Sequence, residues 1–281
     1  MVKILILSVF GSPLEKEITW FWDPFFISLI KLKEIDITLN IVNIYDNKSQ
    51  LPGLMKKLNI KGEYHQVSNQ EVSHPWIATP DFIHAKALDL LFKNAKVEEY
   101  DWVLVLENDT YLKKSVMGVL EKAEQFKEEL KKPLVFGEVV MEEWTVPRVS
   151  PQFMLMSPGV SKMRKRIFEE GVEKMVGRKV ENTAIAHTGW FFFQTAIANK
   201  HIEVINLTAP VHHFDSATCL YSGYKGGILN PRFKNNRVKN MKRLKIIQEE
   251  VISYVNKNSE YTFRDMDSIW KNLDEEGIIY D

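Results

Sequence analysis

The sequence predicts an α/β fold, with a mostly parallel sheet flanked by helices, on three observations. Short apolar segments alternate with helix-like segments through the first half of the chain, which is the pattern of βαβ units. Residues 103–106 are apolar without interruption, as expected of a strand that is covered on both faces. The 281 residues are 45% hydrophobic and 26% charged, which is enough apolar material for a sizeable core.

The predicted elements follow one another in regular order. The strands are expected at residues 2–10, 37–45, 63–68 and 101–107. Between them the helical pattern covers residues 18–33, 51–58 and 80–95. The second half is less regular, and helices are expected there at residues 161–170, 183–199 and 239–255.

Charge and cysteine content narrow the function classes. Lys+Arg and Asp+Glu both number 37, so no overall charge bias points to nucleic acid or an anionic membrane. The single cysteine, Cys219, excludes a disulfide within the chain and fits a reducing compartment. The first apolar run is too short for a signal peptide, and no segment has the length of a transmembrane helix. We therefore expect a soluble, cytoplasmic protein.

Two acids follow the most apolar strand, in the stretch "DWVLVLENDTYL". Glu107 and Asp109 are separated by one amide, Asn108, so an extended chain sends both carboxylates to the same side. Ligands of open parallel sheets bind beyond the C-terminal ends of the strands. Two close carboxylates repel each other unless a cation or protons intervene, and Mg²⁺ or Mn²⁺ would suit oxygen ligands. The alternative is an ordinary polar loop after a strand.

Five further segments share an order and spacing with a known family. They are "VNIYDNKS" (42–49), "HAKALDLLFKNA" (84–95), "FMLMSPGVSKMRKRIFEEG" (153–171), "VENTAIAHTGWFFFQTAIANKHIEVINL" (180–207) and "APVHHF" (209–214). With the acidic stretch, they make the chain resemble the GT-A-fold glycosyltransferases that use nucleotide-sugars, closest in layout to the inverting family 2. The resemblance covers roughly residues 1–215. Glu107 stands at the first acidic place of the family's DxD motif.

The resemblance implies a metal site. Glu107 and Asp109 would hold Mn²⁺ or Mg²⁺, and a histidine of the segment 209–214 would complete the set of ligands. His212 and His213 point in opposite directions in an extended chain, so only one of them can face the ion. His213 is preferred, because the family's histidine tends to close its strand.

The resemblance also implies a site for the nucleotide-sugar donor. Asp46 would contact the nucleobase or ribose, Lys86 would neutralise part of the donor's charge, and Asn108 would also bind the donor. Lys225 lies in a stretch with three glycines, 219–237, and would add positive charge at the diphosphate. An ordinary surface loop is the alternative for that stretch.

The chain departs from the family's pattern at the position of the catalytic base. Where the family has two acids, this chain has Glu181 followed by Asn182, and an amide cannot accept a proton. Glu181 is therefore the candidate base, with Glu142 or Asp215 as alternatives. A retaining mechanism, or a protein that has lost activity, also stays open.

The resemblance implies a catalytic domain over residues 1–230, with nucleotide-sugar binding in 1–112, the acceptor side in 113–215, and a helical extension in 231–281. The acceptor is unspecified: a glycan, lipid, protein or modified nucleic acid. One alternative is a sugar nucleotidyltransferase, but the first strand is followed by "SVFGSPLEKE", which has one glycine and mixed charge. The other is a non-catalytic module that binds carbohydrate or nucleic acid. That module is suggested by the missing second acid. The basic stretch 232–245 would separately attract a polyanionic acceptor, although a solvated helix face is the simpler interpretation.

Overall fold

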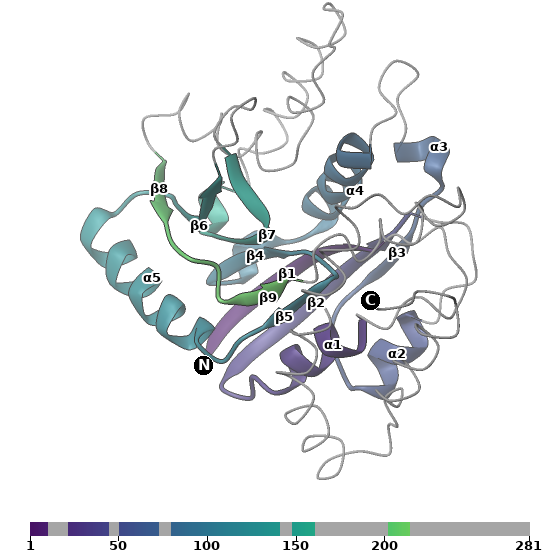
Figure 1. Ribbon diagram of the computed structural model, residues 1–281, viewed down its shortest axis with the longest axis horizontal. Coiled ribbons are helices and arrows are strands. Elements are labelled where there is room, and N and C mark those ends of the chain that lie inside the picture. The colour runs from purple at the N-terminus through teal and green to yellow at the C-terminus, as the bar shows by residue number, and fades with distance from the viewer. Residues whose placement is uncertain (11–21, 45–50, 73–79, 141–147, 161–201, 214–281) are drawn as a thin grey trace, which may run out of the picture. The chain divides into compact units, whose positions relative to one another are not determined.

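A computed structural model describes residues 1–10, 22–44, 51–72, 80–140, 148–160 and 202–213 (Figure 1). In chain order the elements are β1 (Val2–Phe10), α1 (Trp22–Ile30), β2 (Ile35–Asn43), α2 (Leu51–Lys57), β3 (Tyr64–Gln66), α3 (Asn69–Val72), α4 (Pro80–Asn94), the 3-10 helix η1 (Val97–Glu99), β4 (Trp102–Leu106), β5 (Thr110–Leu112), α5 (Val116–Leu130), β6 (Leu134–Val140), β7 (Arg148–Met156), β8 (Glu203–Asn206) and β9 (Val211–His213).

The larger of the two described sheets has seven strands, in the order β3-β2-β1-β4-β7-β6-β8. β1 pairs in parallel with β2 and with β4, β2 with β3, and β6 with β8. β7 alone runs antiparallel to its neighbours β4 and β6 in this sheet. The predicted mostly parallel α/β sheet is confirmed.

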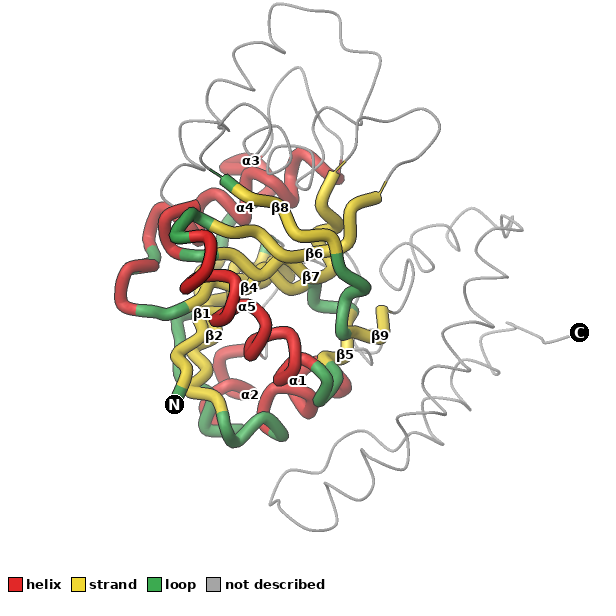
Figure 2. The backbone as a smooth tube through the Cα atoms, turned by 90° about the vertical axis from the view of Figure 1, so that its left-hand side faces the viewer, coloured by secondary structure: helices red, strands yellow, loops and turns green. Residues whose placement is uncertain are grey.

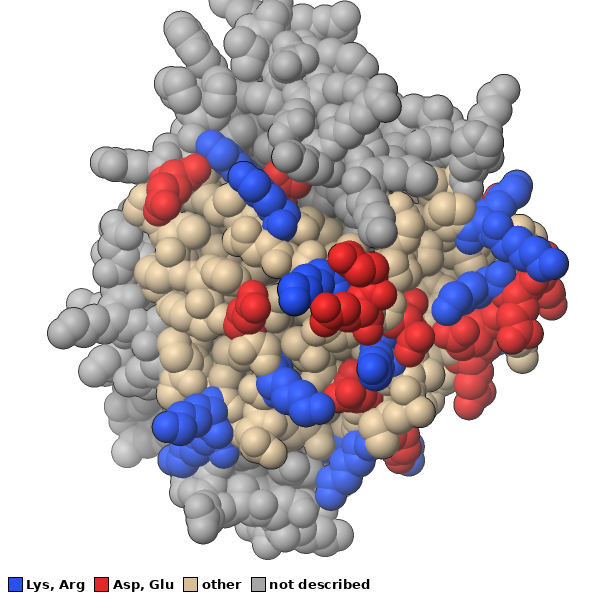
Figure 3. All heavy atoms as spheres, turned by 180° about the vertical axis from the view of Figure 1, so that it is seen from behind, with Lys and Arg blue, Asp and Glu red and all other residues tan. Residues whose placement is uncertain are grey.

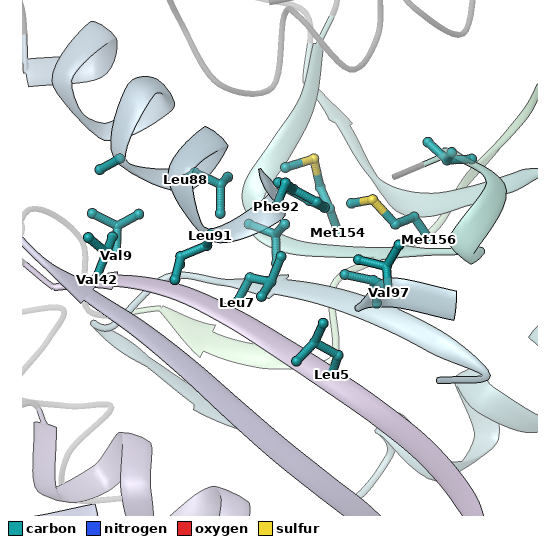
Figure 4. Packing of buried hydrophobic residues seen from close by; sticks show 14 of the residues in the cluster. Leu5, Leu7, Val9, Val42, Leu88, Leu91, Phe92, Val97, Met154 and Met156 are labelled. Carbon is teal, nitrogen blue, oxygen red and sulfur yellow. The ribbon is translucent and has the colours of Figure 1, made fainter. Parts of the chain in front are cut away.

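Helix α4 covers one face of the sheet. Every second residue of β1 and β4 points to it, so that Leu5 and Leu7 pack with Val103 and Val105. From α4 come Leu88, Leu91 and Phe92, and from β7 come Met154 and Met156 (Figure 4). Val103 and Val105 of β4 are apolar because they pack under α4. Trp102, Leu104 and Leu106 point to the opposite face and are buried too, so the whole strand is apolar.

The opposite face of β4 meets helix α5, which crosses in front of the strands in Figure 2. The indole of Trp102, fully buried, donates a hydrogen bond to the Glu124 carboxylate, and the Lys127 ammonium lies 5.3 Å from the indole ring centroid. Phe126 of α5 and Phe136 of β6 bring their ring centroids to 6.1 Å. Both faces of β4 are therefore buried.

Helix α3 begins with a capping box. The Ser68 backbone amide donates to the Glu71 carboxylate at 2.6 Å, and the Glu71 amide donates back to the Ser68 hydroxyl at 3.3 Å. These hydrogen bonds to the charged form lower the pKa of the exposed Glu71 carboxyl. The box fixes the chain just after β3.

The predicted elements agree well with the described ones. The strand expected at 37–45 lies at Ile35–Asn43, because the parallel register pairs Ile35 with Val2 and continues to the pair of Asn43 with Phe10. The helices expected at 51–58 and 80–95 end one residue earlier, and α1 falls inside the expected 18–33. The helices expected at 161–170, 183–199 and 239–255 lie outside the described residues.

The chain divides into two units. The larger comprises residues 1–11, 32–107 and 113–211 and holds the seven-stranded sheet with α2 to α5. The smaller comprises residues 12–31, 108–112 and 212–281, and among its described residues α1 packs against β5. The expected boundary at residue 230 stays a prediction.

Two surface properties concern possible partners. On the face shown in Figure 3, the acidic and basic side chains of the described residues are interspersed, in keeping with the zero net charge of the chain. Among the described helices, none is both long and apolar enough to cross a membrane. The basic stretch 232–245 lies outside the described residues.

Candidate metal centre

The turn between β4 and β5 carries the two acids and the amide singled out in the sequence. β4 ends at Leu106 and β5 begins at Thr110, so Glu107, Asn108 and Asp109 form the whole connection. This turn lies at the C-terminal end of a central parallel strand, where ligands of such sheets bind. Asn108 and Asp109 are 7% and 8% exposed, which is unusually buried for polar side chains.

A buried hydroxyl fixes the end of β4. The backbone pairing of β1 with β4 runs from the pair Ile4–Trp102 to the pair Leu7–Val105 and stops there. At the next position the Ser8 hydroxyl donates a 2.6 Å hydrogen bond to the Leu106 carbonyl. The Ser8 side chain therefore continues the hydrogen bonding between the strands by one position, directly before Glu107.

The two adjacent histidines of β9 have different neighbours. His213 places its Nε2 atom 3.4 Å from Oδ1 of Asp109. His212 instead faces Tyr111, with 6.2 Å between the ring centroids. β9 and β5 form a separate two-stranded sheet, which the hydrogen bond from the Lys113 amide to the Pro210 carbonyl extends at 2.8 Å.

Glu107, Asp109 and His213 can each offer one ligand atom, and these atoms lie within 4.8 Å of one another. Only Asn108 separates the two acids, so the covalent chain itself keeps their carboxylates near each other. Holding two carboxylates together at a largely buried position is unfavourable unless positive charge compensates it. The group has the composition and spacing of a cation site.

The ligand atoms fit a divalent ion of the predicted kind. Carboxylates suit Mg²⁺, Ca²⁺ and Mn²⁺, whereas an imidazole is a ligand that Mg²⁺ and Ca²⁺ seldom take. Two carboxylates with one imidazole therefore favour Mn²⁺ within the predicted pair of ions. Three protein ligands also leave coordination positions open for oxygens of a substrate.

The other predicted site residues are only partly within the described chain. Lys86 lies half-buried in α4, and its role at the donor stays a prediction. Asp46, Glu181 and Lys225 lie outside the described residues. The same is true of the alternative bases, Glu142 and Asp215.

Two residues near the candidate site, Ser8 and Tyr111, were not predicted from the sequence. Ser8 looked like one polar residue within an apolar strand, and Tyr111 like one more aromatic residue of a strand. Tyr111 is 4% exposed, and its hydroxyl accepts a 3.1 Å hydrogen bond from the Lys31 ammonium. The one feature of the sequence that could have pointed to Tyr111 is its position two residues after Asp109.

A second polar group lies at the C-terminal ends of β2 and β3. The Asn43 side-chain amide donates to Oε1 of Gln66 at 3.1 Å and to the Tyr64 hydroxyl at 3.3 Å. The Tyr64 hydroxyl also donates to Gln66. These side chains satisfy one another, so we assign no ligand to them.

No protein-family model matches the sequence, and no curated protein matches it significantly. Solved structures do resemble the chain. An active-site mutant of LgtC is 10% identical with a TM-score of 0.50, over 72% of this chain and 72% of that one. Mouse xyloside xylosyltransferase 1 is 12% identical with a TM-score of 0.45, over 73% of this chain and 85% of that one. Residues 1–349 of S. aureus TarS, solved with UDP, are 14% identical with a TM-score of 0.42, over 92% of this chain and 76% of that one.

The fold class follows from the sheet and from the similarity to LgtC. The described chain has a mostly parallel central sheet flanked by helices, and it shares the GT-A fold with LgtC. This confirms the fold that the sequence resemblance implied. Since one fold hosts many activities, the activity has to be argued from the site.

Proposed function

We propose that this protein is a metal-dependent glycosyltransferase, which moves a sugar from a nucleotide-sugar to an acceptor hydroxyl. The observation that carries the proposal is the group formed by Glu107, Asp109 and His213 after β4 of a GT-A fold. Two carboxylates and an imidazole, partly buried at the ligand-binding end of a parallel sheet, can hold a cation against the phosphates of a bound substrate.

The proposed residues divide the work at the donor. Glu107, Asp109 and His213 would hold Mn²⁺ or Mg²⁺, which when bound supplies positive charge for the leaving nucleoside diphosphate. Lys86 and Lys225 would add positive charge at the same phosphates. The buried Asn108 offers an amide that can both donate to and accept from the donor.

The acceptor side completes the reaction. For an inverting course, Glu181 would accept the proton of the acceptor hydroxyl while that oxygen attacks the anomeric carbon. The bond between the anomeric carbon and the diphosphate oxygen breaks, and the nucleoside diphosphate leaves with its electron pair. Asp46 would hold the nucleobase or ribose of the donor. Glu142 and Asp215 remain the alternatives for the base.

A screen of common nucleotide-sugars tests this proposal. Release of the nucleoside diphosphate is measured with Mn²⁺, with Mg²⁺ and with EDTA, in the absence of an acceptor. We expect hydrolysis of at least one donor with Mn²⁺, and its loss with EDTA. Equal rates with Mn²⁺ and with EDTA would contradict the metal dependence, and no turnover of any donor would contradict the transferase.

Two variants make the screen specific to the site. Asp109→Asn removes one charge from the proposed ligands, so turnover should fall at least roughly tenfold. Asp36→Asn is the matched control, because Asp36 forms an exposed ion pair with Lys61 at 2.9 Å and belongs to the start of β2. Exposed ion pairs contribute little to the free energy of unfolding, so this variant should fold normally and keep the wild-type rate.

The same preparation separates the alternatives. A sugar nucleotidyltransferase would release pyrophosphate from a nucleoside triphosphate and a sugar phosphate, which is measured directly. A non-catalytic binding module would be stabilised by a ligand without turning it over. Either result, with no nucleoside diphosphate released from any nucleotide-sugar, would replace the proposal.

A further inference from the structure

The small β5–β9 sheet carries or adjoins two of the three proposed metal ligands. Asp109 directly precedes β5, and His213 is the last residue of β9. A sheet of only two short strands is marginally stable by itself. Side-chain contacts must therefore help to hold β9 at the place where His213 meets Asp109.

One such contact joins the two strands. The rings of Tyr111, in β5, and His212, in β9, have centroids 6.2 Å apart and planes inclined by 37°. Tyr111 is 4% exposed, so its ring is enclosed, while His212 is half-buried. His212 and His213 share a peptide unit, so a contact that fixes His212 also restricts the backbone that carries His213.

The tyrosine is itself held from a third element. Lys31 follows α1 directly and continues its hydrogen bonding, since the Lys31 amide donates to the Ile27 carbonyl at 3.2 Å. The Lys31 ammonium donates a 3.1 Å hydrogen bond to the Tyr111 hydroxyl and lies 5.8 Å from its ring centroid. α1 packs against β5, so the backbone that carries Lys31 is held next to the strand that carries Tyr111.

We propose that Tyr111 is a positioning residue for His213. Its ring is held by Lys31 at the hydroxyl, packs against His212, and so keeps the His213 imidazole 3.4 Å from Asp109. This inference rests on the proposed function, because it concerns the same metal group. It gives the adjacent histidines separate roles: His213 is a ligand, and His212 is the contact that sets its place.

The test measures the affinity of the free protein for Mn²⁺ by electron paramagnetic resonance, without any nucleotide-sugar. Tyr111→Leu removes the aromatic ring, and we expect the affinity to fall about 10-fold, the lower end for partners outside the ligand set. Tyr111→Phe keeps the ring and loses the hydrogen bond from Lys31, so its affinity should lie between those of the wild type and Tyr111→Leu. His212→Phe keeps an aromatic ring without a ligand nitrogen, so its affinity should stay close to wild type.

Tyr64→Phe is the matched control. Tyr64 is a half-buried tyrosine of β3, whose hydroxyl accepts a hydrogen bond from Asn43 and donates one to Gln66, as part of a different polar group. Loss of the Tyr64 hydroxyl should lower the melting temperature slightly and leave the Mn²⁺ affinity unchanged. If Tyr111→Leu does not fold, His212→Leu removes the same ring contact at a half-buried position.

The outcomes separate the inference from the proposed function. If the wild-type protein binds no Mn²⁺, both are wrong. If it binds and Tyr111→Leu lowers only the melting temperature, Tyr111 is merely structural and the inference alone is wrong. The inference is also overturned if Tyr111→Phe binds as weakly as Tyr111→Leu, or if His212→Phe loses as much affinity as His213→Ala.

Discussion

The Ser8 hydroxyl and the Leu106 carbonyl are joined by a 2.6 Å hydrogen bond at the point where the backbone pairing of β1 and β4 ends. Ser8 is 1% exposed, so water does not compete for this carbonyl. The bond ties the last residue of β4 to the neighbouring strand, directly before Glu107. A core contact thus determines where the candidate metal-binding turn begins.

Replacing Ser8 with alanine should cost about 1–3 kcal/mol of unfolding free energy, because the buried Leu106 carbonyl loses the hydrogen bond from the hydroxyl. Urea unfolding at constant m-value measures this loss. Ser28→Ala is the control: that hydroxyl, also buried, donates at 2.6 Å to the Phe25 carbonyl within α1 and ties no strand. We expect Ser8→Ala, and not Ser28→Ala, to weaken Mn²⁺ binding as well. Equal Mn²⁺ affinity in the two variants would show that the Ser8 bond does not position the turn.

The face of the sheet under α4 should be sensitive to the loss of a buried side chain. Leu91→Ala removes a side chain that is 1% exposed and packs against the sheet (Figure 4), so it should destabilise the fold by about 2–5 kcal/mol. Leu130→Ala, at an exposed position at the end of α5, serves as the control and should cost much less. Chemical unfolding of both variants checks the order. A similar loss for both would contradict the described packing of α4.

Much of this fold was predictable because local patterns and tertiary structure agree. β1 and β4 are buried on both faces, so their apolar runs indicated strands directly. α5 was missed because its buried residues, Val116, Leu120 and Ala123, are few and lie among charged ones. The antiparallel insertion of β7 between β4 and β6 was also missed, since strand order depends on long-range pairing.

The candidate site was predictable to a similar degree. Glu107 and Asp109 were found because two acids after a buried strand are visible in the sequence itself, and His213 came from the family resemblance. Ser8 and Tyr111 were not predicted, because their importance depends on which residues lie opposite them in space. A serine in an apolar strand and an aromatic residue in another carry no signal of their own.

The proposed base can be tested apart from the metal. Glu181→Gln keeps the shape of the side chain and removes its ability to accept a proton, so transfer should slow roughly 10²- to 10⁴-fold. Donor affinity should stay unchanged, because the base acts on the acceptor hydroxyl. Donor affinity, melting temperature and transfer rate are measured on one preparation. A near-normal rate with a lower melting temperature would assign Glu181 a structural role, and Glu142→Gln and Asp215→Asn would be next.

A double-mutant cycle tests whether Asp109 and His213 bind the same ion. Each single variant, Asp109→Asn and His213→Ala, should weaken Mn²⁺ binding and reduce turnover at limiting Mn²⁺. If both side chains hold one ion, the double variant should lose much less than the product of the two single losses, because the site is already lost after the first.

The alternative is that Asp109 and His213 only form an ion pair at 3.4 Å. In that case the cycle would show coupling in the unfolding free energy and none in Mn²⁺ affinity. His212→Ala is the comparison variant, since it removes the ring that contacts Tyr111 and leaves the imidazole of His213 in the chain. It should weaken Mn²⁺ binding less than His213→Ala does. The reverse order would transfer the ligand role to His212, and the preference for the histidine that closes the strand would be wrong.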